Sequence, residues 1–370
     1  MDIFLNILHT LASFFIVISV IVFIHEFGHY IVAKWSGVKI EAFAIGFGKE
    51  LIGRTDKSGT RWKICALPLG GYVKMFGDAG AASTADEDAI EQMSEEEKKL
   101  TFHHKPLWKK ALIVAAGPVF NFILTIGVFC YFIMTVGLSS ADPIVGEVMK
   151  DSAAQEAGLT ENDRITHING EAITRFNEIA YNVATNLGTP VQLRIERGGE
   201  VKMVTLTPRE VEDDDGLGNK VKRYLIGIKS KEIKLEDVGL ATALKESVHR
   251  TYVICETTLK VIGQMITGQR SAQDLKGPVG IAQLSGQAAD KDFTTVLWLI
   301  AMLSANLGLV NLLPIPLLDG GHLAYYAAEA ASGRPLAQKV QEWGFKAGFV
   351  ILMTLMAFTL FNDLHRLIYS

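Results

Sequence analysis

The sequence predicts an α-helical polytopic membrane protein with four transmembrane helices, a β-rich region on one side of the membrane and a small α+β domain on the other. Of its 370 residues, 49% are hydrophobic and only 21% are charged, which is too apolar for a typical soluble enzyme. Four apolar runs are long enough, or nearly so, for the ~20 residues of helix that cross a bilayer. The stretches between them carry strand and turn patterns.

The four apolar runs lie at about residues 5–33, 111–136, 294–318 and 344–361. The first has no basic n-region and no small-residue cleavage site, so we expect a retained helix and not a signal peptide. The chain then divides into eight predicted parts: transmembrane helix 1 (1–34), a β-rich loop with an acidic linker (35–106), transmembrane helix 2 (107–138), an α+β domain (139–232), an amphipathic helical segment (233–292), transmembrane helix 3 (293–322), a loop (323–342) and transmembrane helix 4 (343–370).

The distribution of basic residues predicts the orientation in the membrane. Residues 1–33 contain no Lys or Arg. The following loop carries basic residues beside both of its spans: Lys34, Lys39, Lys105, Lys109 and Lys110. By the positive-inside rule this loop faces the cytoplasm, so the N-terminus and the segment 139–292 are expected outside. The formal net charge of −4 suggests no nucleic-acid partner.

The polar regions show distinct patterns. The cytoplasmic loop has β-prone runs separated by glycine, with a turn at "TDKSGT" and then an acidic linker in which Ser94 and Glu97 have capping-box spacing. In the outer segment, "AAQEAGLTENDRITHINGEAI" resembles a PDZ domain of the bacterial protease type. Such domains usually take up an extended peptide as an added strand. The alternative is a module that only packs or shields.

The first apolar run contains "HEFGH", which places ionisable side chains where a membrane makes them costly. On a helix, His25 and His29 stand one turn apart on one face, with Cβ atoms ~5–6 Å apart. This spacing suits two zinc–nitrogen bonds and leaves other positions on the metal open. Glu26 can then reach a water at the metal and act as general base. The alternative is a structural histidine pair that lines a polar cavity or a proton path.

A catalytic zinc with two histidine ligands needs a third protein ligand, often a carboxylate. Helices 1 and 3 run in the same direction, and Asp319 is the first charged residue at the cytoplasmic end of helix 3. Pro314 and Pro316 interrupt the helix before it, and Gly320-Gly321 allow a sharp turn after it. We therefore expect Asp319 to be the third ligand, with His322 able to orient it. The weaker competitors are His9, His103, His104 and His365.

Six stretches, in order along the chain, resemble the motifs of bacterial site-2 proteases: "HEFGH", "GFGK", "PLGGYVKM", "AAGPVFNF", the PDZ-like stretch and "NLLPIPLLDGGH". This is the intramembrane zinc metalloprotease family that includes the regulator of sigma-E protease, and this chain has room for a single PDZ domain. The resemblance implies zinc bound by His25, His29 and Asp319, with Glu26 as the catalytic glutamate. It also implies a substrate whose transmembrane helix unwinds to reach the zinc.

Other positions match the family's motifs as well. The resemblance implies that Asn311 holds the substrate carbonyl or the developing oxyanion, with an interhelical hydrogen bond as the alternative. The same two alternatives apply to Asn121, for which we expect a role in packing. Residues 46–49 match a membrane re-entrant β-loop that offers a strand edge to the unwound substrate, unless its glycines form an ordinary turn. The implied substrate-binding residues are Gly46, Phe47, Gly48 and Pro314.

These observations predict an intramembrane zinc endopeptidase of the bacterial inner membrane, with its active site toward the cytoplasmic side. Its implied partners are the lipid bilayer, single-span membrane protein substrates such as anti-sigma factors or signal-peptide remnants, and a peptide in the PDZ groove. A second reading is a non-catalytic membrane adaptor that displays a PDZ domain and keeps a structural metal. A zinc or proton transporter ranks last because helices 2 and 4 are nearly devoid of polar residues.

Overall fold

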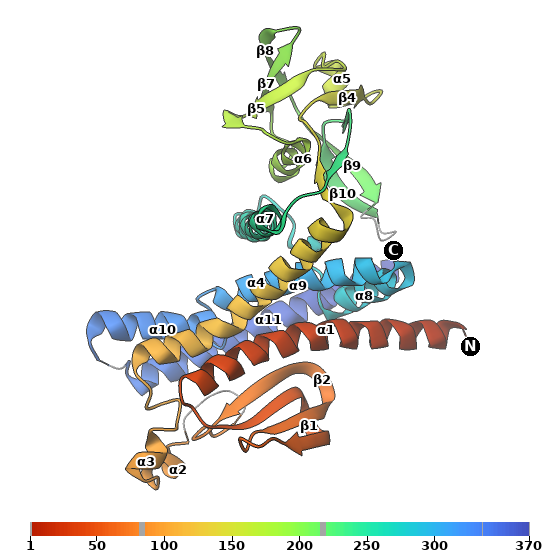
Figure 1. Cartoon of the computed structure of the whole chain (residues 1–370). Helices are drawn as coiled ribbons and strands as arrows, with labels where there is room; N and C mark the ends of the chain where they lie inside the picture. Colours follow the sequence, from red (N-terminus) through yellow and green to blue (C-terminus); the bar gives the residue numbers. More distant parts are fainter. Residues whose placement is uncertain (1, 81–85, 215–219, 335, 370) are drawn as a thin grey trace. The chain divides into compact units, whose positions relative to one another are not determined.

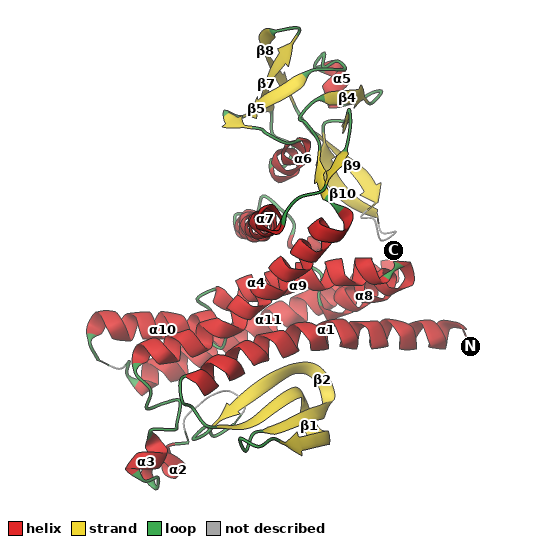
Figure 2. Cartoon of the chain, viewed as in Figure 1, coloured by secondary structure: helices red, strands yellow, loops and turns green. Residues whose placement is uncertain are grey.

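The chain forms two compact units (Figure 1). The computed structural model describes residues 2–80, 86–214, 220–334 and 336–369. The first unit contains Met1–Val128 and Gln273–Ser370, and the second contains Phe129–Ala272. Long helices dominate the first unit, and most of the strands belong to the second (Figure 2).

Within the described residues, four helices are long and apolar enough to cross a membrane. They are α1 (Asp2–Trp35), α4 (Leu107–Val136), α9 (Phe293–Leu312) and α11 (Gln338–Tyr369). In the most apolar window of α4, 44% of the residues are buried, compared with 11% in α11. The apolar side chains of α11 therefore face outward, as expected for a helix in contact with lipid. The prediction of a polytopic helical membrane protein is confirmed.

The third membrane helix ends earlier than predicted. α9 ends at Leu312, whereas the predicted third span extended to residue 322 with an interruption at Pro314 and Pro316. Asp319 instead begins a separate helix, α10 (Asp319–Ser332), which occupies the first part of the predicted loop 323–342. Pro314 and Pro316 lie in the break between the two helices. A proline has no backbone N–H and its ring clashes with the preceding turn, which is why the helix stops here.

A long β-hairpin packs against α1 in the first unit. Its strands are β1 (Ile40–Thr55) and β2 (Arg61–Met75). Residues 42–45 of β1 pair with residues 71–74 of β2 and also with residues 61–64, so the hairpin folds back on itself. Its apolar side chains share a core with α1 and α4, formed among others by Tyr30, Ala33, Phe43, Val73 and Ile113. Entry of this hairpin into the membrane stays a prediction.

Shorter helices complete the first unit. α2 (Glu87–Glu91) and α3 (Glu95–Lys98) follow the hairpin, and Ser94 and Glu97 form the predicted capping box of α3. α8 (Pro278–Lys291) packs against α1, α9 and α11. The buried carboxylate of Asp363 on α11 accepts hydrogen bonds from the N–H groups of Gly277 (3.1 Å) and Gly280 (2.9 Å), which fixes the start of α8.

The second unit holds an α+β domain around a four-stranded sheet in the order β6-β5-β7-β8. These strands are β5 (Arg164–Ile168), β6 (Glu171–Ala172), β7 (Val191–Arg197) and β8 (Glu200–Leu206). Three further pairs are β3 (Leu138–Ser140) with β12 (Lys234–Glu236), β4 (Val145–Val148) with β11 (Ile228–Ser230), and β9 (Arg209–Asp214) with β10 (Lys220–Leu225).

The helices of this unit are α5 (Ala153–Glu156), α6 (Phe176–Thr185) and α7 (Leu240–Ile266), and the short helix η1 (Ala272–Asp274) follows. The domain has its own apolar core, formed among others by Val145, Ile165, Ile179, Leu193 and Ile195. Independent folding of this domain is therefore physically reasonable. Its identity as a PDZ domain stays a prediction.

Candidate metal centre

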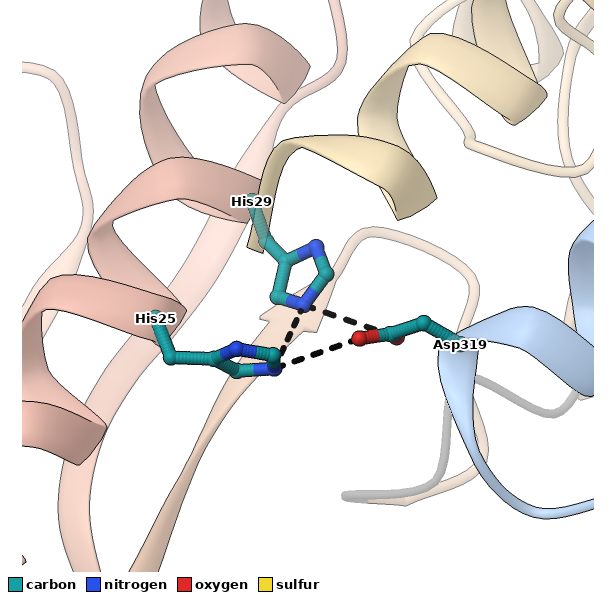
Figure 3. Close-up of side chains that lie close together, drawn as sticks. All are labelled: His25, His29 and Asp319. Carbon is teal, nitrogen blue, oxygen red and sulfur yellow. Dashed lines mark hydrogen bonds and ion pairs between the residues drawn. The ribbon is translucent and has the colours of Figure 1, made fainter. Parts of the chain in front are cut away.

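Two histidines of α1 and one aspartate of α10 converge on a single point (Figure 3). The Nε2 atoms of His25 and His29 lie 3.2 Å apart. Asp319 Oδ2 lies 3.3 Å from His25 Nε2, and Asp319 Oδ1 lies 3.6 Å from His29 Nε2. Among the described residues these three form a group whose donor atoms could hold one metal ion.

The two histidines meet because of the helix between them. His25 and His29 are four residues apart on α1, so their side chains lie on the same face, one turn from each other. The face is covered by α4, where a Cβ atom at Gly117 would overlap with His29 Nε2. Glycine at this position lets α4 approach the imidazoles closely.

Asp319 reaches the histidines because the chain between α9 and α10 is tightly packed. Gly320 and Gly321 lie in the first turn of α10, and not in a sharp turn as the sequence suggested. A Cβ on Gly320 would overlap with the carbonyl oxygen of Leu313, and one on Gly321 with that of Ile315. The glycines therefore allow the connecting segment to press against the helix start. The carboxylate at the first position of α10 is also favoured by the helix dipole.

The imidazole of His29 is held by a backbone carbonyl. Its Nδ1 lies 2.9 Å from Ile113 O on α4. A carbonyl only accepts hydrogen bonds, so Nδ1 carries the proton and donates it. In the neutral ring Nε2 then has a free lone pair, and this is the atom that faces His25 and Asp319. The tautomer of His29 is thus fixed in the form that binds a metal.

The donor set fits a divalent metal such as zinc. In a tetrahedral zinc site with bonds of ~2.0–2.1 Å, neighbouring donor atoms are roughly 3.3 Å apart, close to the separations of 3.2, 3.3 and 3.6 Å found here. Asp319 Oδ2 is buried, and apart from its contact with His25 Nε2 at 3.3 Å it makes no hydrogen bond within the described residues. A buried carboxylate oxygen without a partner is costly, and a cation at this point would compensate it.

The metal donors border a cavity of about 240 Å³. Glu26 lines it beside His25 and His29 and is not one of the donors. Asn311 lines it from α9, with its Nδ2 3.5 Å from His25 Nε2. The remaining walls are mostly apolar and come from β2, the loop before α4, α4 and α10, among them Met75, Phe102, Ile113, Val114 and Tyr326.

The predicted substrate residues of β1 do not line this cavity. Its wall is formed by β2 instead, through Gly71, Tyr72 and Val73. A Cβ on Gly71 would lie 3.0 Å from Glu26 Cγ, so the strand runs directly against the glutamate. Gly46 lies against Cys65 and Leu67 on the hairpin itself, and Pro314 is exposed in the break after α9.

Sequence reasoning gave "PLGGYVKM" no role of its own beyond the resemblance. The pair Gly70-Gly71 was the available signal, because glycine in a strand often marks a close approach of another chain segment. Phe47 contacts Gly70 and stacks on Tyr72 with ring centroids 6.0 Å apart, so it touches this strand from the side of β1.

The other histidines have separate partners or positions. His103 Nε2 lies 2.9 Å from the buried carboxylate of Asp78, and His9 Nδ1 lies 3.5 Å from Asp290. His322 lines the cavity but does not belong to the converging donors. His104 Nδ1 is 2.8 Å from Thr101 Oγ1. The structure thus gives His9, His103 and His104 partners away from the converging donors, whereas His322 shares their cavity.

Comparison with known proteins shows which family the chain resembles. Residues 13–355 match peptidase family M50. A protein of Agrobacterium fabrum named "Putative zinc metalloprotease" is 44% identical over 97% of this chain and 96% of its own length. A relative of the same name in Rhizobium meliloti is 42% identical over 98% of both chains. The metalloprotease MmpA of Caulobacter vibrioides is 36% identical over 96% of this chain and 95% of its own.

The family match covers most of the chain, and relatives well above 30% identity align with it over nearly its full length. The chain therefore belongs to peptidase family M50 and is a zinc metalloprotease with several membrane-spanning helices.

Proposed function

We propose that this protein is an intramembrane endopeptidase that cleaves the transmembrane segment of single-span membrane proteins. The observation that carries the proposal is the position of Glu26. This carboxylate lies beside three converging metal donors in one cavity, on a helix apolar enough to span the membrane. Ionisable residues are kept in such helices for function by default.

In this proposal His25, His29 and Asp319 hold the zinc ion. A bound zinc ion would make water more acidic and polarise the scissile carbonyl. The chain's own residues do the rest. Glu26 takes a proton from the attacking water, the water oxygen bonds to the carbonyl carbon, and the C–N bond breaks. Glu26 then returns the proton to the departing nitrogen, so the peptide is hydrolysed without net consumption of acid or base.

Asn311 is proposed to steady the substrate. Its amide Nδ2 lies 3.5 Å from His25 Nε2, at the rim of the donor group. An N–H group in this place can donate a hydrogen bond to the substrate carbonyl and, more strongly, to the oxyanion that forms from it. The amide is uncharged and lines the same cavity as the three donors and Glu26.

The substrate backbone is proposed to lie along β2. Residues 71–74 pair with β1 on one edge, and among the described strands the opposite edge has no partner. Gly71, Tyr72 and Val73 line the cavity. A helix that has unwound in a poorly hydrated place needs partners for its N–H and C=O groups. A strand edge beside the metal donors would supply them and hold the peptide extended.

The proposed setting is a bacterial inner membrane, with the metal centre toward the cytoplasm and the segment 139–292 outside. It rests on the distribution of Lys and Arg along the sequence. Anti-sigma factors and signal-peptide remnants are the proposed substrate classes, by resemblance to the family. Residues 139–232 are proposed to form a single PDZ domain that receives an extended peptide.

The test compares the purified full-length protein with Glu26→Gln in detergent. Both are analysed for bound zinc and incubated with a panel of single-span membrane proteins. We expect about one zinc per chain in both, with cleavage reduced by about 10²- to 10⁴-fold in the variant, because Glu26 moves protons and does not bind the metal.

Glu41→Gln is the matched control. Glu41 is a carboxylate of the same unit that pairs with Lys74 (2.8 Å) and does not line the cavity, so cleavage should be unchanged. Equal cleavage by the wild type and Glu26→Gln, or a wild type without zinc, would overturn the proposed mechanism and favour a membrane adaptor with a structural role.

A further inference from the structure

Asn121 of α4 contacts a metal-binding histidine without belonging to the donor group. Its side chain is completely buried, and its amide Nδ2 lies 3.1 Å from His25 Nδ1. The amide oxygen Oδ1 is also buried and has no hydrogen-bond partner within the described residues. A polar group in this state is costly, so the position calls for an explanation beyond packing.

The two imidazoles of the site are supported differently on their outer side. His29 Nδ1 faces the carbonyl oxygen of Ile113, which can only accept a hydrogen bond. His25 Nδ1 faces a side-chain amide, which can donate through its nitrogen or accept through its oxygen. The tautomer of His29 is therefore fixed by the backbone, whereas that of His25 depends on which end of the Asn121 amide faces it.

With Nδ2 toward His25, the amide donates to Nδ1, and the neutral ring must carry its proton on Nε2. That atom is the one that faces His29 and Asp319. A metal at this point needs the lone pair of Nε2, which moves the proton to Nδ1. Nδ1 then needs an acceptor. A half-turn of the Asn121 amide supplies Oδ1, the oxygen that lacks a partner.

The side-chain amide of Asn121 can rotate while its backbone stays in place, because the backbone is fixed between two helices. Its carbonyl oxygen accepts hydrogen bonds from Ser304 Oγ (3.0 Å) on α9 and from Thr125 Oγ1 (3.1 Å) on α4. A Cβ on Gly308 would lie 3.2 Å from Asn121 Cβ, so α9 approaches closely here. The contact between α4 and α9 thus holds the amide at a constant distance from His25.

We propose that Asn121 is a positioning residue for zinc binding: its amide turns so that Oδ1 accepts the Nδ1–H of His25 and leaves Nε2 free for the metal. The inference rests on the proposed assignment of His25 as a zinc ligand. Asn121 therefore sets the zinc affinity of the site through the orientation and tautomer of one ligand. It touches neither the zinc nor the substrate.

The experiment measures the zinc dissociation constant of the full-length protein in detergent by competition with a fluorescent chelator. Asn121→Leu removes both the oxygen and the nitrogen of the amide and replaces them with an apolar side chain of similar size. We expect zinc binding to weaken by about 10- to 100-fold in this variant. Asn121→Asp keeps an acceptor oxygen, and we expect its zinc affinity to stay within about threefold of the wild type, since carboxylates commonly support metal-binding histidines.

Ser304→Ala is the control for a merely structural role. It removes a buried hydrogen bond to the same residue, at the same helix contact, and leaves the side chain of Asn121 in place. We expect a lower unfolding temperature of the zinc-free protein and a zinc dissociation constant within about threefold of the wild type. The backbone of Asn121 stays in place in this variant, because Thr125 Oγ1 still donates to its carbonyl oxygen and Gly308 still lets α9 approach.

The inference is overturned if Asn121→Leu binds zinc as tightly as the wild type, or if Ser304→Ala weakens zinc binding as much as Asn121→Leu does. If Asn121→Leu does not fold, Asn121→Asp decides, because a loss of tenfold or more in that variant would contradict the role of an acceptor. A wild type that binds no zinc would instead overturn the proposed function, so the two failures are distinguishable.

Discussion

The two parts of the chain that supply the proposed metal donors are built in opposite ways. His25 and His29 stand on an uninterrupted helix, and their separation follows from the helix repeat alone. Asp319 stands at the start of α10, after a break of six residues between Leu312 and Asp319, and its position depends on how that break packs. One half of the site is thus fixed locally and the other by tertiary contacts.

This difference has a consequence for robustness. A helix in the membrane keeps its backbone hydrogen bonds because no water competes for them, so the histidine pair tolerates changes nearby. The break carries Leu317 with a positive φ of 78°, which is uncommon for a residue with a branched side chain. Such a conformation persists only where the surroundings hold it. Small changes at the break should therefore reach the metal, whereas small changes on α1 away from the histidines should not.

The largest effect is expected from removing one of the two histidines on α1. His29→Ala should abolish stoichiometric zinc binding and reduce cleavage to background, because the two remaining donors are too few to hold the ion. Zinc content of the purified protein and cleavage of a single-span substrate are the measurements. The matched control is His103→Ala, since His103 pairs with Asp78 outside the cavity. Full zinc content in His29→Ala would remove this histidine from the ligand set.

The packing of the break is tested by Gly321→Ala. The added Cβ would overlap with Ile315 O, and overpacking of this kind costs about 1–3 kcal/mol. If this cost is relieved by a displacement of Asp319 from the histidines, zinc binding weakens by roughly 5- to 150-fold. Chelator competition measures it.

Gly127→Ala on α4 is the matched control, because a Cβ there meets nothing within 4 Å. Its zinc affinity should equal that of the wild type. An unchanged zinc affinity in Gly321→Ala would show that the break is as tolerant as α1, and the contrast between the two halves would be lost.

The smallest effect on the metal is expected from the second unit. Asp163 is buried there and receives two hydrogen bonds from Arg197, from Nε (2.6 Å) and Nη2 (2.7 Å). Burial, the largest single influence, raises the pKa of Asp163. The hydrogen bonds and charge of Arg197, together with the hydrogen bonds from Thr160, outweigh burial and hold the pKa below its usual value. Asp163→Asn should destabilise this unit by about 2 kcal/mol at neutral pH.

The stabilisation by Asp163 has a definite pH dependence. Its pKa is lower in the folded protein than in the unfolded chain, so the contribution is present above the unfolded pKa and is lost as the pH falls through the folded one. Thermal unfolding of wild type and Asp163→Asn at pH 7 and in acid should show the difference shrinking in acid. Zinc affinity at pH 7 should not change. A weaker zinc site in this variant would show that the second unit supports the metal centre.

Local sequence determined those features of the protein that depend on neighbouring residues. Apolar runs of sufficient length predicted the four spanning helices, because a bilayer core demands internally hydrogen-bonded segments. Four-residue spacing on a helix predicted that the two imidazoles of "HEFGH" share a face. Two prolines placed a break before Asp319, and the structure has it between α9 and α10. Ser94 and Glu97 predicted a capping box that the structure contains.

Tertiary structure decided what depends on segments far apart in the chain. Both strands of the hairpin carry glycines, and only packing against α1 determined that Gly71 of β2, and not Gly46 or Gly48 of β1, borders the cavity. The contact of Asn121 with His25 joins residues 96 positions apart, and no local pattern specifies it. Gly320 and Gly321 fit a turn or a tightly packed helix start equally well by sequence. These long-range contacts depend on how the helices and strands pack closely against one another, which is decided only in the folded chain.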